Sequence, residues 1–275
     1  MAYENFIPQI WSEAINRDLE RRCVFVEDCN RQYEGDVKKA GDTVRILGVG
    51  QPTITTTTAK AISLSAAENV EDTSVAMPIR QISYYNYKID DIDKRQAVGG
   101  VMDALKSETS ARLASTMDAY VAALSVDALA VKYAANDVQI TATNVLAQID
   151  VALEKLYEND VDPGSGITVT LPPWVYTLFR QAYVSADTNN SGILKNGKVA
   201  MYGNAQIKMS NNVHKASTTY SIMVRTNQAI AFANPMNHIE AYRPEGGFSD
   251  AVKGFVLYDA KIVRPKEMII MNVKK

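Results

Sequence analysis

The chain has 275 residues, of which 47% are hydrophobic and 22% charged, and its formal net charge is -2. This length allows one large domain or two modest ones, and the near-neutral charge argues against a protein that binds nucleic acid through a strongly basic surface. No apolar run is long enough to span a membrane, "MAYENFIPQI" lacks the apolar core of a signal peptide, and Cys23 and Cys29 are too few for a disulfide framework, so we expect folding in a reducing cytoplasm.

The first 76 residues predict two limbs rather than a packed core. Residues 8–22 place Trp11, Ile15 and Leu19 four apart, which predicts a short amphipathic helix that needs another surface to lean on. In residues 30–76 the strand-like "GDTVRIL" is followed by glycine, proline and the threonine-rich "TITTTTAKAISLS". Because this stretch has few large apolar groups, it predicts an extended, mostly exposed β-hairpin.

A strand and an unusually long helix follow. Residues 79–89 predict a strand with aromatic side chains on both faces, such as Tyr84 on one and Tyr85 on the other. Apolar residues at a 3–4 spacing then continue to Leu124, which predicts a helix of about thirty residues and roughly 45 Å. Asp93 is its expected N-cap, and Glu108 and Arg112 are expected to pair on its exposed side.

The second half alternates helix and strand. The expected helices are 144–158 and one that begins at "PPWVYTLFRQAY", and the expected strands are "ITVTL", "AQIKMSNNV", "YSIMVRT" and "AIAFAN". The closing "GFVLYDAKIVRPKEMIIMNV" (254–273) predicts a strand, a sharp turn at Arg264–Pro265 and a second strand. Its apolar character predicts that the end of the chain is docked in a sheet.

The polar loop 187–199 resembles two ligand-binding motifs, and each lacks an essential residue. Its first residues match a calcium loop, but Lys198 stands where a bidentate glutamate is needed. The loop also contains Gly192-x-x-x-x-Gly197-Lys198, but Val199 replaces the Ser or Thr that would hold magnesium. We therefore expect a plain surface loop.

Other candidate constellations are equally weak. Asp90, Asp91 and Asp93 precede a helix, where carboxylates stabilise the helix dipole, so capping explains them better than metal binding. His214 and His238 could join the two cysteines in a zinc site only with a spacing unlike any zinc knuckle. No catalytic, cofactor-binding or metal-binding residue is predicted, no cofactor is expected, and we do not expect an enzyme.

Four segments in order resemble the major capsid proteins of tailed bacteriophages, which have the Hong Kong 97-type fold. They are "FIPQIWSEAINRDLERRCVFVEDCNRQYEGDVKKAGDTVRI" (6–46), "YNYKIDDIDKRQA" (85–97), "ILKNGKVAMYGNAQIKMSNNV" (193–213) and "GGFSDAVKGFVLYDAKIVRPKEMIIM" (246–271). The resemblance runs nearly from end to end.

The resemblance implies an α+β fold with an N-arm, an extended β-hairpin loop (E-loop), a long spine helix, and peripheral and axial domains. The N-arm would be residues 1–30 and the E-loop residues 31–76. The peripheral domain with the spine helix would comprise 77–139 and 241–275, and the axial domain 140–240. The closing strands would then complete the peripheral sheet beside the strand that precedes the spine helix.

The resemblance further implies a protein that assembles with itself into pentamers and hexamers of an icosahedral phage head. The shell would enclose double-stranded DNA without sequence-specific binding, would involve no membrane, and would be assembled in the host cytoplasm as part of the virion. Scaffold, portal and decoration proteins are the further partners it implies. The arm begins within the first ten residues, so we expect no long scaffolding segment before it, and no crosslink is predicted for Lys60.

Three alternatives remain open at this point. The first is an encapsulin-like protein shell, which shares the fold and which nucleic acid inside the particles would exclude. The second is a metal- or nucleotide-binding enzyme that uses the 187–198 loop, which calorimetry with calcium or ATP would test. The third is a non-shell virion protein, against which the long helix and the helical arm count.

Overall fold

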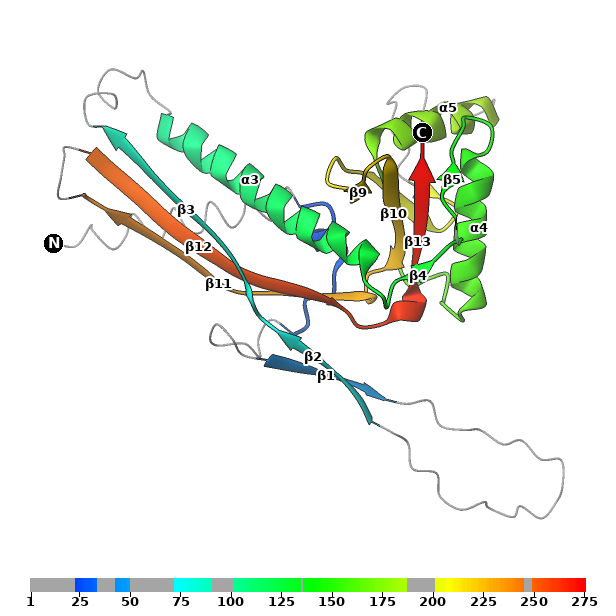
Figure 1. Cartoon of the computed structure of the whole chain (residues 1–275), viewed down its shortest axis with the longest axis horizontal. Helices are drawn as coiled ribbons and strands as arrows, with labels where there is room; N and C mark the ends of the chain where they lie inside the picture. Colours follow the sequence, from blue (N-terminus) through cyan, green and yellow to red (C-terminus); the bar gives the residue numbers. More distant parts are fainter. Residues whose placement is uncertain are drawn as a thin grey trace, which may run out of the picture.

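The computed structural model describes residues 23–33, 43–49, 72–90, 101–134, 136–186, 201–244 and 249–275. These residues form an elongated part, built on one long helix and a three-stranded sheet, and a compact part, built on a second sheet and two helices (Figure 1). A further pair of strands projects from the elongated part (Figure 1). We call the two larger sheets the long sheet and the compact sheet.

The long sheet has the order β11-β12-β3 and is antiparallel throughout. Its strands are β3 (Gln81–Asp90), β11 (Ile230–Tyr242) and β12 (Ser249–Ile262). The helix α3 (Val101–Ala123) lies along one face of this sheet (Figure 1) and is followed by the short 3-10 helix η3 (Leu124–Val126). Its 23 described residues span about 35 Å, and the predicted beginning of the helix near Asp93 falls outside the described residues.

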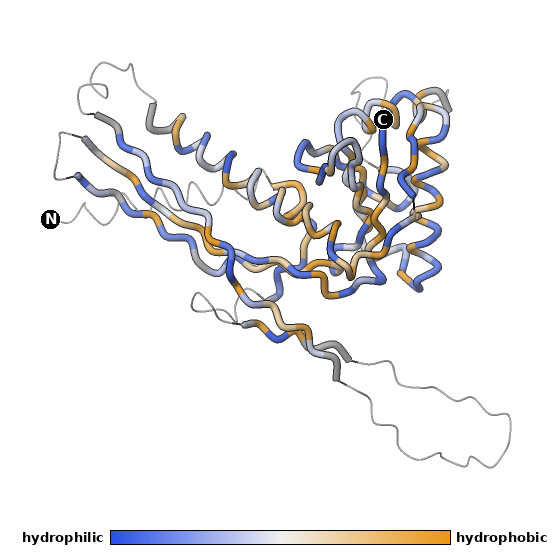
Figure 2. The backbone as a smooth tube through the Cα atoms, in the orientation of Figure 1, coloured by the Kyte–Doolittle hydropathy of each residue, from blue (hydrophilic) through white to orange (hydrophobic). Residues whose placement is uncertain are grey.

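Packing between α3 and the long sheet follows the spacing of the apolar residues. Leu113, Met117 and Val121 on α3 are buried in one cluster with Val256 and Tyr258 on β12. Figure 2 shows hydrophobic and hydrophilic residues interspersed along α3. The predicted pair is also present, because Arg112 Nε lies 2.8 Å from Glu108 Oε1 on the exposed side.

Gly254 allows an unusually close approach between β12 and its neighbours. A Cβ atom at this position would lie 2.6 Å from Cζ and Oη of Tyr85 on β3 and 2.9 Å from the backbone oxygen of His238 on β11. The ring of Tyr85 therefore covers the space that a side chain would occupy, and it stacks with Tyr87 at 5.9 Å.

Replacing Gly254 by alanine is expected to lower the free energy of unfolding by about 1–3 kcal/mol, because the added methyl group overpacks the site. Denaturant unfolding measures this loss. In a Tyr85→Ala background the penalty should shrink, since the ring is gone, but not vanish, because the main-chain carbonyl of His238 remains. An equal penalty in both backgrounds would contradict the close packing against Tyr85.

The projecting strands are β1 (Thr43–Val49) and β2 (Asp72–Pro78), which pair antiparallel with Thr43 opposite Pro78. This confirms the base of the predicted hairpin, while residues 50–71 lie outside the described part. Val44, Ile46 and Met77 pack in a small cluster with Leu257 of β12 and with β11 alanines. The base of the hairpin is therefore fixed on the face of the long sheet that α3 does not cover.

The compact sheet joins segments from distant parts of the chain, in the order β4-β13-β10-β6-β8-β7. Its strands are β4 (Val131–Lys132), β5 (Val138–Gln139), β6 (Ile167–Leu171), β7 (Met201–Tyr202), β8 (Ala205–Met209), β9 (Lys215–Ala216), β10 (Thr219–Thr226) and β13 (Met268–Lys274). The helices α4 (Val145–Glu158) and α5 (Pro173–Ala186) cover one face, and α5 begins at a proline, as the sequence predicts.

Both faces of the compact sheet are buried at its centre. On β10, Ile222 and Val224 pack in the cluster beneath α4 and α5, whereas Met223 packs in the cluster that contains α3. Ile269 and Ile270 on β13 divide between the two clusters in the same way. A strand covered on both faces has few polar positions, which explains the apolar run "MIIM" near the end of the chain.

The predicted closing hairpin is wrong. The strand before Pro265, β12, does lie beside β3 in the long sheet, as expected. The strand after it, β13, pairs instead with β10, β4 and β5 in the compact sheet, and the 3-10 helix η4 (Pro265–Glu267) carries the chain from one sheet to the other. The final strand therefore does not lie in the sheet that contains β3, and β11, predicted with the axial domain, belongs to the long sheet.

Candidate functional site

Residues 23–33 run through the junction between α3 and the compact sheet. The first anchor is Asp118 on α3, whose side chain is 1% exposed. Its carboxylate accepts hydrogen bonds from the backbone N–H groups of Val24 at 2.7 Å, Phe25 at 2.9 Å and Val26 at 3.1 Å. Burial raises the pKa of Asp118, and the three N–H donors and the charge of Arg225 only partly offset this. These three donors precede and begin the 3-10 helix η1 (Val26–Asp28), where a negative charge is favourable.

The second anchor is Arg225 on β10, which is fully buried. Its guanidinium donates to the carbonyl oxygens of Asp28 and Phe25, both at 2.6 Å, and its Nη1 lies 3.5 Å from Cys29 Sγ. The segment is thus held between an anion at its N–H groups and a cation at its C=O groups. A buried charge of either sign is stable only while the other and these hydrogen bonds are present.

Lys208 on β8 forms the third anchor. Its ammonium lies 2.7 Å from Glu27 Oε2 and 2.9 Å from Asp28 Oδ1. Burial by itself would lower the pKa of Lys208, but the hydrogen bonds and charges of Glu27 and Asp28 outweigh burial and raise it. The ammonium is therefore the form that this contact stabilises.

The same segment also reaches the long sheet. Asn30 forms a parallel bridge with Ala231 on β11, with Asn30 N–H donating to Ile230 O and Phe232 N–H donating to Asn30 O, both at 2.9 Å. Helix, compact sheet and long sheet are all tied to residues 23–33. We call residues 23–33 and these anchors the N-terminal junction.

A second junction orients the projecting hairpin. Asp259 on β12 is buried and accepts hydrogen bonds from Tyr120 Oη on α3 at 2.7 Å and from Arg80 N–H, between β2 and β3, at 3.1 Å. Burial, together with the hydrogen bond to Asp259, raises the pKa of Tyr120, so the phenol keeps its proton and remains a donor. Lys261 Nζ on β12 donates to Ala76 O on β2 at 2.8 Å, so a second hydrogen bond holds the hairpin against β12. The hairpin therefore leaves the body in a fixed direction.

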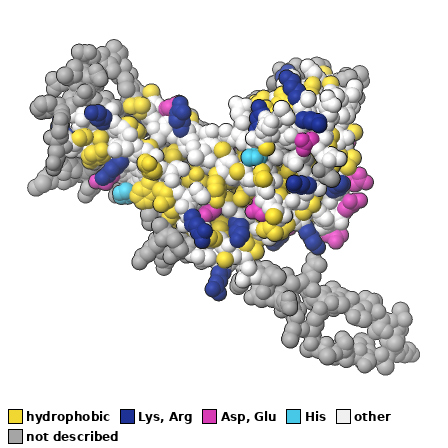
Figure 3. All heavy atoms as spheres, in the orientation of Figure 1, with side chains coloured by type: hydrophobic (Ala, Val, Ile, Leu, Met, Phe, Trp, Pro, Cys, Tyr) yellow, Lys and Arg dark blue, Asp and Glu magenta, His cyan; other side chains and the backbone are white. Residues whose placement is uncertain are grey.

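Apolar side chains remain uncovered on the long sheet. Along β3, Ile82 is 56% exposed and Tyr84 is 82% exposed. The register aligns Tyr84, Phe255 and His238 across the three strands, on the face that α3 does not cover, and the His238 and Phe255 rings lie 5.7 Å apart. Figure 3 shows hydrophobic side chains along this elongated part of the surface.

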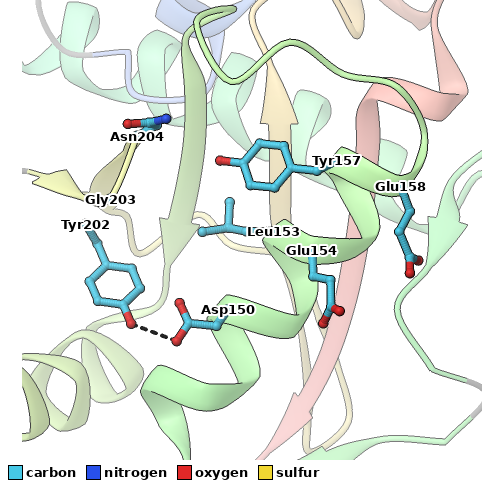
Figure 4. Close-up of a pocket in the computed structure, with 8 residues that line it drawn as sticks. All are labelled: Asp150, Leu153, Glu154, Tyr157, Glu158, Tyr202, Gly203 and Asn204. Carbon is cyan, nitrogen blue, oxygen red and sulfur yellow. Dashed lines mark hydrogen bonds between the residues drawn. The ribbon is translucent and has the colours of Figure 1, made fainter.

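The compact part carries an acidic groove of about 820 Å³ between α4 and the turn from β7 to β8 (Figure 4). Asp150, Glu154 and Glu158 recur every four residues along α4 and line the groove. Tyr202 Oη donates to Asp150 at 2.9 Å (Figure 4), and burial together with this hydrogen bond raises the pKa of Tyr202 to about 12. Within the described residues no group of three or more His, Cys, Asp or Glu side chains is arranged to hold a metal ion. The groove therefore presents three carboxylates from one face of α4.

Several predicted candidates can be placed. Cys23 and Cys29 are both buried and form no disulfide, and neither histidine joins them in a metal-binding group within the described chain. Asp91, Asp93, Lys60 and the loop 187–199 lie outside the described residues. No helix in the part of the chain that the structure describes is both long and apolar enough to cross a membrane.

The residues that hold both junctions together were not singled out from the sequence. Asp118 carried a recognisable signal, because it lies one turn from the buried Ala114 and Ala122 and so interrupts an apolar stripe. Arg225 carried a similar signal within "YSIMVRT". Neither signal predicts which groups the two charged side chains bind. Those groups are main-chain atoms of a segment about 90 to 200 residues away in sequence.

Comparison with known proteins finds no family model and no curated protein that matches this sequence. Solved structures do match. A structure from Mycobacterium phage Che8 is 26% identical, with a TM-score of 0.76 and 90% of each chain covered. The capsid of cyanophage P-SCSP1u is 16% identical, with a TM-score of 0.70, and covers 92% of this chain and 88% of its own. A virus-like particle from Pyrococcus furiosus is 9% identical, with a TM-score of 0.62, and covers 98% of this chain and 100% of its own.

Proposed function

We propose that this chain, which has the Hong Kong 97-type fold of phage capsids, is the major capsid protein of a bacteriophage head. The observation that carries the proposal is the match over 90% of both chains with a TM-score of 0.76 to a phage structure. The match agrees with the resemblance read from the sequence alone. The capsid structures that the chain resembles support a structural role.

In this proposal the long sheet, α3 and the hairpin base form the peripheral domain, and the compact sheet with α4 and α5 forms the axial domain. The sheet pairing supports moving β11 into the peripheral domain and β13 into the axial domain. Copies assemble into pentamers and hexamers, and these close into an icosahedral shell around double-stranded DNA. The net charge of -2 suits a shell protein that does not bind the packaged DNA strongly through electrostatic attraction.

Further partners belong to the same proposal. The shell is part of the virion and is assembled in the host cytoplasm, with portal, scaffold or decoration proteins as companions. Each contact between copies needs only modest strength, because closure and multiplicity stabilise the whole.

Electron microscopy of the purified full chain tests the proposal. Closed particles, or pentameric and hexameric rings, are the expected result. A monodisperse monomer at high concentration and in the presence of co-expressed phage head proteins would contradict it.

An encapsulin-like shell is the second candidate, and the match to the archaeal virus-like particle over all of that chain favours it. The two candidates differ in content. Particles isolated from infected cells that contain packaged double-stranded DNA support the phage head, whereas particles that enclose only protein support the alternative.

Deleting residues 1–22 is expected to leave a folded body that forms no closed shell. The N-terminal junction begins at Cys23 and supplies its own anchors, so the melting temperature should change by only about 2 °C or less. Calorimetry and electron microscopy of the same sample measure both effects. Particles of wild-type size from the truncated chain would show that the segment is dispensable for assembly.

A further inference from the structure

We draw no further inference here: the strongest candidate, the groove between α4 and the turn from β7 to β8 that Asp150, Glu154 and Glu158 line, is a cluster of carboxylates, and nothing else among the described residues indicates which ligand it would bind.

Discussion

Replacing Asp118 by alanine is expected to lower the free energy of unfolding by about 3–5 kcal/mol, the range found when one partner of a buried charge pair is removed. The substitution leaves the N–H groups of Val24, Phe25 and Val26 without an acceptor. It also removes the negative charge that lies across the segment from the fully buried Arg225. Denaturant unfolding of the unassembled chain measures the loss.

Asp118→Asn is the matched control, because it keeps the shape and one acceptor oxygen but not the charge. Its expected loss is smaller than that of alanine. If the two variants lose the same amount, the charge, rather than the three hydrogen bonds, is the dominant contribution. A melting curve like that of the wild type for Asp118→Ala would mean that residues 23–33 are not held by this carboxylate.

Thiol labelling reports the same event locally. Burial raises the pKa of the Cys29 thiol, so at pH 8 the folded chain contains less reactive thiolate than an ordinary cysteine would. Slow labelling of the native chain and rapid labelling after denaturation are expected. In Asp118→Ala the rate should rise under native conditions, because the segment that carries Cys29 has lost its anchor.

The local elements were largely predictable because their signals are local. The strand at β6 is buried at all five positions, and α4 carries the expected stripe of Ile149, Leu153 and Leu156. On β3, the predicted division of Tyr84 and Tyr85 between two faces is confirmed by their exposure and by the close contact of Tyr85 with Gly254. Period-two and period-3.6 patterns contain this information directly.

The pairing of strands into sheets could not be predicted from these local patterns. The sequence of β12 and β13 is compatible with a hairpin, since a turn with proline separates two apolar strands. The alternative, in which the chain crosses into another sheet, differs only in contacts that are distant in sequence. The run "MIIM" was nevertheless a usable signal, because four consecutive buried residues indicate a strand covered on both faces.

The two junctions were missed for a related reason. Asp118 and Arg225 bind main-chain groups of residues 23–33, and Asp259 binds the N–H group of Arg80. Sequence patterns report which side chains are buried, but not which backbone donors need a partner. These buried charges fix the positions of residues 23–33 and of the link between β2 and β3, and that geometry appears only in three dimensions.

Replacing Val256 by aspartate is expected to remove more than about 4 kcal/mol of stability, so that little soluble, folded chain is recovered. Val256 is 4% exposed on β12 and packs beneath α3 in the cluster that contains Met117 and Phe232. Its cross-strand neighbours, Ser83 and Asn237, offer no cation for the new carboxylate. The group must therefore be desolvated without a charge partner, or the helix must separate from the sheet.

Val256→Thr is the matched control, because it distinguishes the effect of a buried charge from the effect of altered packing. Threonine has nearly the shape of valine and adds one hydroxyl, so an expected loss of about 1–2 kcal/mol would leave the chain folded and able to assemble. Soluble yield, denaturant unfolding and particle formation are measured on both variants. Similar stability for the aspartate variant and the wild type would mean that α3 does not seal this face of the long sheet. In that case the two junctions, which depend on Asp118 and Tyr120 in that helix, would have to be derived anew.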